Sequence, residues 1–138
     1  MTELNTRHTD NPNFPPLLPL LAKAKSSYLL WVGFYQTLPK LHRHSLGQKI
    51  DTIFVEIIEA ISIATFLSKE EKHPWVRLAI RKTDTMKILL MVLWETKSID
   101  DKKYLLVSVK IEEIGRMLGG WSGQLSKQNS PVIKTREK

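Results

Sequence analysis

Histidine and cysteine, the side chains that most often carry metal or nucleophilic chemistry, offer little in this sequence. His42 and His44 flank Arg43, whereas a metal site needs a third ligand and no adjacent cation, and no carboxylate stands beside them. Because the chain has no Cys, disulfides, zinc–thiolate sites, iron–sulfur clusters and thiol nucleophiles are excluded. The pattern of some helical ribonucleases, an Arg followed four to six residues later by a His, does not occur either.

Carboxylate pairs and glycines are present, but they lack the partners that catalysis requires. Glu56 and Glu59 form one pair and Glu112 and Glu113 another, yet a di-iron site in a bundle also needs a His three residues after a Glu. The four glycines between residues 115 and 123 end an expected helix, whereas phosphate-binding loops begin one. No nucleotide-binding or metalloprotease motif occurs. We therefore expect no enzymatic activity, no metal ion and no cofactor.

Four amphipathic stretches make up most of the chain. Apolar residues recur at spacings of three and four from Leu21 to Leu38, Leu46 to Leu67, Val76 to Leu93 and Tyr104 to Leu125. Pro39 ends the first stretch, and short polar segments separate the others, so consecutive helices must run in opposite directions. The sequence therefore predicts an all-α fold, an antiparallel up-down four-helix bundle with helices of roughly 20–25 residues.

Residues between the stretches predict where the helices begin and end. Ser45 and Gln48 have the spacing of a capping box at the start of the second helix. Pro74 suits the first turn of the third helix, and Asp100 or Asp101 is expected to cap the fourth. Glycines weaken the end of the fourth helix, so we expect that end to fray between residues 121 and 125.

Composition divides the chain into three parts. Residues 1–16, rich in Asn, Thr, Asp and Pro, are predicted to be a disordered lead-in; residues 17–125 form the bundle domain, and residues 126–138 a disordered basic tail. The longest uncharged run, residues 26–39, is 14 residues long, whereas a membrane span needs about 20. The lead-in also lacks the apolar core of a signal peptide. We therefore expect a cytoplasmic protein without membrane contact.

The helices carry more apolar surface than one bundle can bury. Residues 29–34 of the first helix and 88–94 of the third are apolar around the whole circumference. Apolar surface left over in this way marks a contact with a partner, so we predict a homo-oligomer. We expect the first helix to be central to the contact, through Leu30, Trp31 and Phe34. The alternative is a tightly packed monomer whose apolar stripes are simply wide.

The basic residues are unevenly distributed and are the main functional signal. The chain has 21 Lys and Arg against 14 Asp and Glu, which gives a formal charge of +7. Residues 17–49 contain five basic and no acidic side chains, whereas residues 50–67 contain three acidic and no basic ones. Arg77 and Arg81 lie one turn apart, opposite much of the apolar stripe of their helix. Such a strip of bases suits a phosphate backbone, although a solvated, salt-bridged face has the same composition.

Three segments resemble one family of helical proteins. They are Leu38-Pro39-Lys40-x-x-Arg43 with Leu46-Gly47-x-Lys49-Ile50, the Ile-rich second helix, and Ile114-Gly115-Arg116-Met117-Leu118-Gly119-Gly120-Trp121. The sequence resembles the small four-helix bundle proteins that include those encoded in intervening sequences of 23S ribosomal RNA genes. Within that group it is most similar to the accessory variability determinant (Avd) of diversity-generating retroelements.

The resemblance implies a ring-like homopentamer that acts as a non-enzymatic adaptor. Avd-type proteins bind the reverse transcriptase of the retroelement and nucleic acid (template RNA or cDNA), and they support mutagenic reverse transcription and target-gene diversification. The shared motifs carry nucleic-acid binding over to Lys40, Arg43 and Arg116, and helical spacing adds bases of the third helix. The predicted nucleic-acid-binding set is Lys40, Arg43, Lys49, Arg77, Arg81, Lys82, Lys87 and Arg116.

Two other interpretations remain open at this point. An intervening-sequence-type bundle would bind RNA without a reverse transcriptase partner, and the sequence does not distinguish it from an Avd-type protein. The neighbouring genes would do so, because an Avd-type role requires a reverse transcriptase gene and a template and variable repeat nearby. An RNA-cleaving enzyme is the third interpretation, and no visible acid–base pair supports it.

Overall fold

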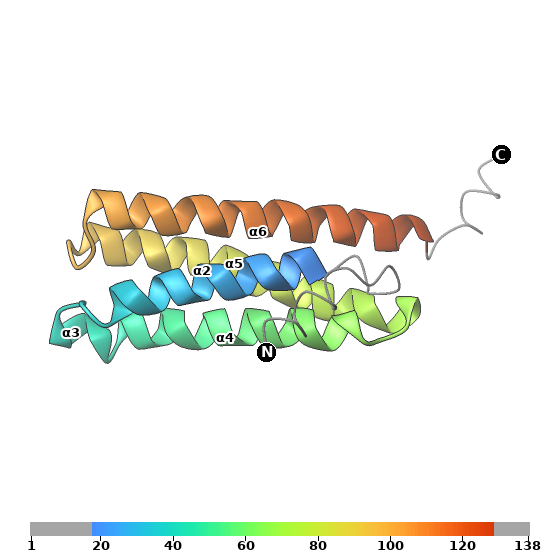
Figure 1. Cartoon of the computed structure of the whole chain (residues 1–138), viewed down its shortest axis with the longest axis horizontal. Helices are drawn as coiled ribbons and strands as arrows, with labels where there is room; N and C mark the ends of the chain where they lie inside the picture. Colours follow the sequence, from blue (N-terminus) through green and yellow to red (C-terminus); the bar gives the residue numbers. More distant parts are fainter. Residues whose placement is uncertain (1–17, 129–138) are drawn as a thin grey trace, which may run out of the picture.

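The computed structural model describes residues 18–128 and confirms the all-α architecture (Figure 1). The predicted lead-in, residues 1–16, and residues 129–138 of the predicted tail lie outside the described residues. No helix within residues 18–128 is both long enough and apolar enough to cross a membrane. The helices are α2 (Leu18–Tyr35), α3 (Lys40–Arg43), α4 (Leu46–Thr65), α5 (Lys69–Glu95) and α6 (Asp101–Gln128).

The four long helices form an antiparallel bundle in which each packs against two neighbours. α4 lies between α2 and α5, and α6 lies between α5 and α2 (Figure 1). α4 and α6 therefore occupy opposite corners of the bundle and run in the same direction. The short α3 lies at the end of the bundle where the turn between α5 and α6 also lies. The outward faces of α4 and α6 consequently point to different sides of the protein.

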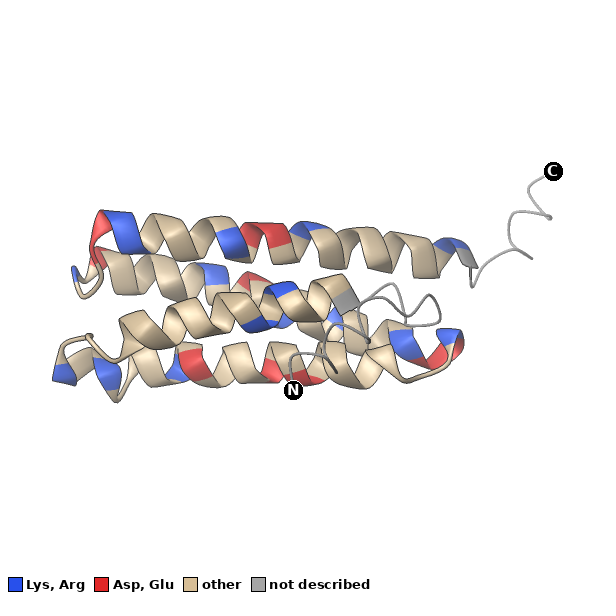
Figure 2. Ribbon diagram, in the orientation of Figure 1, with Lys and Arg blue, Asp and Glu red and all other residues tan. Residues whose placement is uncertain are grey.

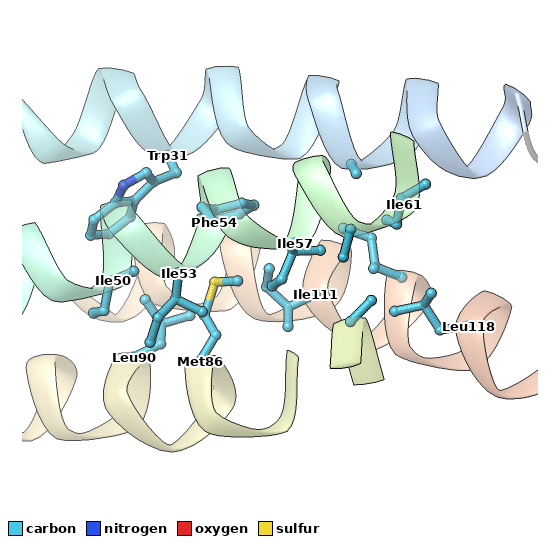
Figure 3. Packing of buried hydrophobic residues seen from close by; sticks show 14 of the residues in the cluster. Trp31, Ile50, Ile53, Phe54, Ile57, Ile61, Met86, Leu90, Ile111 and Leu118 are labelled. Atoms are coloured by element: carbon cyan, nitrogen blue, oxygen red, sulfur yellow. The ribbon is translucent and has the colours of Figure 1, made fainter. Parts of the chain in front are cut away.

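The core is built from the residues that the helical spacing predicted. In α4, Ile50 and Ile57 point inward and belong to the same buried core as Met86 of α5 and Leu118 of α6 (Figure 3). Phe54, which lies outside the main stripe of α4, is also buried, so the apolar face of this helix is broad. Burial of these side chains outweighs the modest helix propensity of Ile, because each contributes about 2 kcal/mol when removed from water.

The helix caps agree with the sequence at one turn and differ at another. Asp100 is confirmed as the N-cap of α6, because its Oδ1 accepts the backbone N–H of Lys103 at 2.8 Å. The capping box expected at Ser45 is wrong, since its side chain makes no cap hydrogen bond. The Ser45 hydroxyl donates instead to the Leu41 carbonyl at 3.0 Å. The short α3 directly precedes Ser45 and supplies this nearer acceptor.

The third long helix begins earlier than expected. α5 starts at Lys69, so Pro74 lies inside the helix rather than in its first turn. Ser68 occupies the N-cap position, and its hydroxyl donates to the Glu71 carboxylate at 2.9 Å. The acidic residues Glu70 and Glu71 lie in the first turn, where their negative charges interact favourably with the positive end of the helix dipole. These favourable terms offset the single backbone hydrogen bond that Pro74 removes.

The last helix is longer than expected. α6 continues to Gln128, so the fraying expected between residues 121 and 125 is wrong, and the helix runs past the bundle boundary expected at residue 125. Trp121 and Leu125 are buried in the bundle and hold the last turns in place. The Lys72 ammonium also lies 5.9 Å from the centre of the Trp121 ring. Side-chain burial therefore overrides the low helix propensity of the glycines in this segment.

Candidate nucleic-acid interface

The connection between α2 and α4 holds α3 tightly against one end of the bundle. Gly47 permits this approach, because a Cβ there would lie 2.8 Å from Leu38 Cδ1 and 2.9 Å from the His42 carbonyl oxygen. The Nδ1 atom of His42 forms a short hydrogen bond with the Ser98 hydroxyl in the turn between α5 and α6. The basic residues of both connections are therefore gathered at the same end.

Arg43, one of the predicted binding residues, has a structural role in this turn. Its Nε and Nη2 atoms donate to the Leu38 carbonyl at 3.3 and 2.8 Å. Its own carbonyl accepts the Tyr35 hydroxyl at 3.0 Å. The guanidinium thus satisfies a carbonyl just beyond the end of α2, where helices leave such groups unpaired. Lys40 and Lys49, by contrast, are exposed and form no ion pair within residues 18–128.

Lys82 and Lys87, also predicted to bind nucleic acid, are half-buried and paired inside the protomer. The Lys82 ammonium contacts the Glu56 carboxylate of α4 at 3.0 Å. The Lys87 ammonium lies 3.5 Å from Glu112 of α6 and 3.8 Å from Asp84. These lysines connect α5 to its two neighbours, so their charges are partly neutralised before any partner arrives.

Arg77, Arg81 and Arg116 form an exposed basic group on the outer surface of α5 and α6. All three side chains are exposed, and none makes a hydrogen bond or ion pair with another described residue. Arg81 precedes Asp84 by about one turn, and Arg116 follows Glu112 by about one turn. Because the two helices are antiparallel and Lys87 bridges these acids, the three arginines lie on the same side of the bridge. We call these three residues the basic half of the outer α5–α6 surface.

The predicted basic residues therefore form two groups rather than one continuous strip (Figure 2). One group, with Lys40 and Lys49, lies at the end of the bundle that holds α3, and the other is the basic half. Between them on α5 and α6 lie Asp84, Glu112 and Glu113, which we call the acidic band. These acids pair with Lys87 and Lys23, so the band offers phosphate no excess of positive charge and interrupts the basic surface between the two groups.

Sequence reasoning left five exposed lysines of residues 18–128 out of the predicted set: Lys25, Lys69, Lys97, Lys102 and Lys127. Lys97, in the turn between α5 and α6, has a positive φ of 65° and adds a base to the α3 end. Lys25 on α2 and Lys102 at the start of α6 are also exposed. Their positions opposite the apolar stripes of their helices were available in the sequence. The position of Lys97 depends on the geometry of the turn, which helical spacing does not give.

Trp31, which was expected to contact a second copy, packs inside its own protomer. Its side chain is fully buried, its ring stacks on Tyr35 with a centroid distance of 5.6 Å, and its Nε1 donates to Asp51 at 3.2 Å. Leu30 and Phe34 are partly exposed and pack against the core. The Trp31 indole is buried because its ring packs between α2 and α4, where it stacks on Phe54.

The exposed apolar surface lies mainly on α5 and α6 rather than on α2. Six large side chains there are between 37% and 62% exposed. They follow Lys87 on α5 and precede Glu112 on α6, so the antiparallel arrangement places them together on the other side of the acidic band. A contiguous apolar patch of this kind marks a partner surface. We call it the apolar half, and it consists of Ile88, Met91, Val92, Leu105, Leu106 and Val109.

Two shifted pKa values reflect how the charged groups are held. A hydrogen bond from Lys23 lowers the pKa of the Glu113 carboxyl, and the positive charges of Lys23, Arg116 and Lys110 lower it further. The Lys23–Glu113 contact is 2.9 Å and joins α2 to α6. Burial lowers the pKa of Lys72, whose ammonium lies among the last carbonyls of α4. Glu113 therefore carries a charge already neutralised by a neighbouring helix.

The described residues do not bring together a catalytic or metal-binding set. Between residues 18 and 128, no three His, Asp or Glu side chains converge as the ligands of a metal ion would. His42 on α3 contacts the Ser98 hydroxyl, and His73 on α5 contacts the Ser122 hydroxyl. The arrangement of charges and apolar side chains instead suits binding.

Comparison with known proteins adds one finding. A family model described as bAvd-like matches residues 26–125, which cover nearly all of the four long helices. Neither a curated protein nor a solved structure matches the chain significantly. The chain therefore belongs to the bAvd-like family, and this membership implies an accessory role of the Avd type in a diversity-generating retroelement.

Proposed function

We propose that this protein is a non-catalytic, homo-oligomeric adaptor that binds the reverse transcriptase of its retroelement together with template RNA or cDNA. In this role it supports mutagenic reverse transcription and so diversifies a target gene. Membership of the bAvd-like family supports the accessory role. A homopentameric ring is the assembly that the Avd resemblance implies.

The observation that carries the proposal is the basic half. Arg77, Arg81 and Arg116 are exposed and form no ion pair or hydrogen bond within the described chain, so their guanidinium groups are accessible to phosphate groups. Arginine pairs with phosphate through two parallel N–H donors, which makes these side chains better suited to this contact than the paired Lys82 and Lys87. We assign nucleic-acid binding first to this group and second to Lys40 and Lys49.

RNA binding tests the nucleic-acid part of the proposal. The double variant Arg77→Glu with Arg81→Glu should weaken binding of a labelled RNA about 100-fold at low salt, measured by fluorescence anisotropy. The matched control is Lys25→Glu with Lys127→Glu, which changes the net charge by the same amount at exposed sites on α2 and at the end of α6. The control should bind much more tightly than the double variant. If both variants lose the same amount of RNA affinity, the loss is an effect of net charge and the assigned surface is wrong.

Co-purification tests the protein partner. The adaptor is expressed with the reverse transcriptase of the retroelement that it is proposed to serve, and the enzyme carries the affinity tag. We expect the two proteins to elute as one complex after nuclease treatment. The Arg77→Glu, Arg81→Glu variant should still co-elute, because those residues are assigned to nucleic acid. If the folded, tagged transcriptase is retained on the column and the untagged protein is not retained with it, the adaptor role is contradicted.

A further inference from the structure

A hollow on the outer face of α6 has no occupant within the described protomer. It has a volume of about 350 Å³, and its described lining belongs entirely to α6. The apolar part of the lining is formed by Leu105, Leu106 and Val109, which are 62%, 45% and 57% exposed. Lys102 and Lys110 form a basic rim. The rim acid, Glu113, is neutralised by Lys23, so the hollow is apolar with a positive edge.

A face with the complementary character lies at the opposite corner of the bundle. Along the outside of α4, Val55, Ile63 and Phe66 are 38%, 40% and 80% exposed. Glu59 lies between them, is exposed, and forms no ion pair within residues 18–128. From Ile50 to the end of α4 the helix carries acidic residues and no basic one. This outward face is therefore apolar with a negative centre.

The two faces also match in length. On α4 the face runs from residue 55 to residue 66, and the hollow runs from residue 102 to residue 113, so both cover the same number of residues. At 1.5 Å per residue each is about 16 Å long, or three helical turns. On α4 the apolar Val55, Ile63 and Phe66 share one face with Glu59, which takes the position between Val55 and Ile63, so a partner groove must accept both apolar side chains and one carboxylate.

We infer that the outer face of α4 from one copy of this chain docks in the α6 hollow of the next copy. Phe66, the most exposed large apolar side chain, enters the hollow, and Glu59 pairs with the lysines of its rim. Because α4 and α6 occupy opposite corners of one protomer, the contact joins two different surfaces. Such a heterologous contact leaves one free face on each end of a pair and therefore builds rings or filaments rather than closed dimers.

The inference specifies the interface of the homo-oligomer in the proposed function and rests on that proposal. Multi-angle light scattering of the wild-type protein is the first measurement. A monomer at all concentrations would remove both the proposed oligomer and this interface. A closed dimer would keep an oligomer but contradict a contact between two different faces. An assembly of more than two copies is the expected result.

Variants of each face then test the interface itself. Leu105→Ser with Val109→Ser impairs the hollow, and Ile63→Ser with Phe66→Ser impairs the α4 face; we expect each variant to be monomeric. The matched control is Leu29→Ser with Leu41→Ser, which removes exposed apolar side chains of α2 and α3 outside both faces and should leave the assembly intact. If both face variants assemble as the wild type does, the interface is wrong although the oligomer stands.

Mixing the two impaired variants gives the most specific result. Each retains the face that the other lacks, so a one-to-one mixture should form heterodimers and no larger species. Circular dichroism shows whether each variant is folded before mixing. Charge exchange supplies an independent check: Glu59→Lys alone should weaken assembly, and adding Lys102→Glu with Lys110→Glu should restore it. Folded variants that stay monomeric in the mixture, together with no restoration by charge exchange, would overturn the proposed pairing.

Discussion

The two halves of the outer α5–α6 surface belong to the same pair of helices and have opposite chemistry. The apolar half exposes six large apolar side chains, among them Leu105 and Val109. The basic half exposes Arg77, Arg81 and Arg116 and no large apolar side chain of comparable exposure. The acidic band separates them. One surface of the bundle is thus divided between an apolar part and a positively charged part.

The difference shows that the bundle constrains only the inward positions of its helices. Along α6 the buried residues recur at spacings of three and four from one end to the other, including Val107 and Leu118. The outward residues change character halfway along the same helix without interrupting that spacing. The fold therefore carries two outward surfaces of different character, and each can be altered without disturbing the core.

The largest expected effect compares neighbouring residues of the apolar half and the core. Val107 is fully buried, whereas Val109 is 57% exposed. Val107→Ser should lower the free energy of unfolding by about 3 kcal/mol, because it removes buried apolar atoms and buries a hydroxyl. Val109→Ser should change it by less than about 0.5 kcal/mol. Urea unfolding of protein at monomer-favouring dilution measures both, and similar losses would mean that the apolar half belongs to the protomer core.

The second effect concerns the basic half and the dependence of binding on salt. Each phosphate contact that is lost reduces the slope of log K against log salt by about 0.7 for single-stranded RNA. The variant Arg77→Ala, Arg81→Ala, Arg116→Ala should therefore reduce the slope by about 2. Leu105→Ser with Val109→Ser should leave the slope unchanged. A reduced slope in the apolar-half variant would show that the two halves do not act separately.

The third effect concerns the glycines beside the basic half. Gly119, Gly120 and Gly123 lie in α6, and a Cβ at any of them would meet no atom of the described protomer within 4 Å. Because Gly is about 1 kcal/mol less favourable than Ala inside a helix, each Gly→Ala change should stabilise the protein by up to that amount. Thermal unfolding measures the gain. Gly47→Ala is the contrasting variant and should destabilise the protein, because its Cβ would overlap Leu38 and the His42 carbonyl.

The sequence was sufficient for the bundle itself. Ala24, Ile57, Leu90 and Leu118 were predicted to face inward and do so, because burial along one face repeats with the helical period. The start of α5 and the capping of α4 were not predicted correctly. Both depend on which nearby group offers the best hydrogen bond. The Ser45 hydroxyl, for example, donates to the Leu41 carbonyl. These hydrogen-bond partners are determined by the three-dimensional geometry of the turn.

The candidate site was predictable only in part, for a related reason. Helical spacing placed Arg77 and Arg81 on an exposed face, and they are exposed. The same spacing does not reveal which bases find acids on neighbouring helices, as Lys82 does with Glu56. Nor does it tell whether an aromatic residue such as Trp31 faces the core or a partner when all its neighbours are apolar. These outcomes depend on how far apart the helices pack.

The smallest effect concerns the carboxylate that lies between the two halves. The pKa of Glu113 is lowered in the folded protein, mainly by the hydrogen bond from Lys23, so its ionised form is favoured by folding. This contribution is present above the ordinary pKa of a Glu, about 4.3, and is lost as the pH falls through the lowered value. The difference in unfolding midpoint between the wild type and Glu113→Gln should therefore shrink between pH 7 and pH 3. Glu59→Gln removes an exposed carboxylate without an ion pair and serves as the control. If the Glu113→Gln difference stayed constant with pH, the link between α2 and α6 would owe its effect to packing rather than to charge.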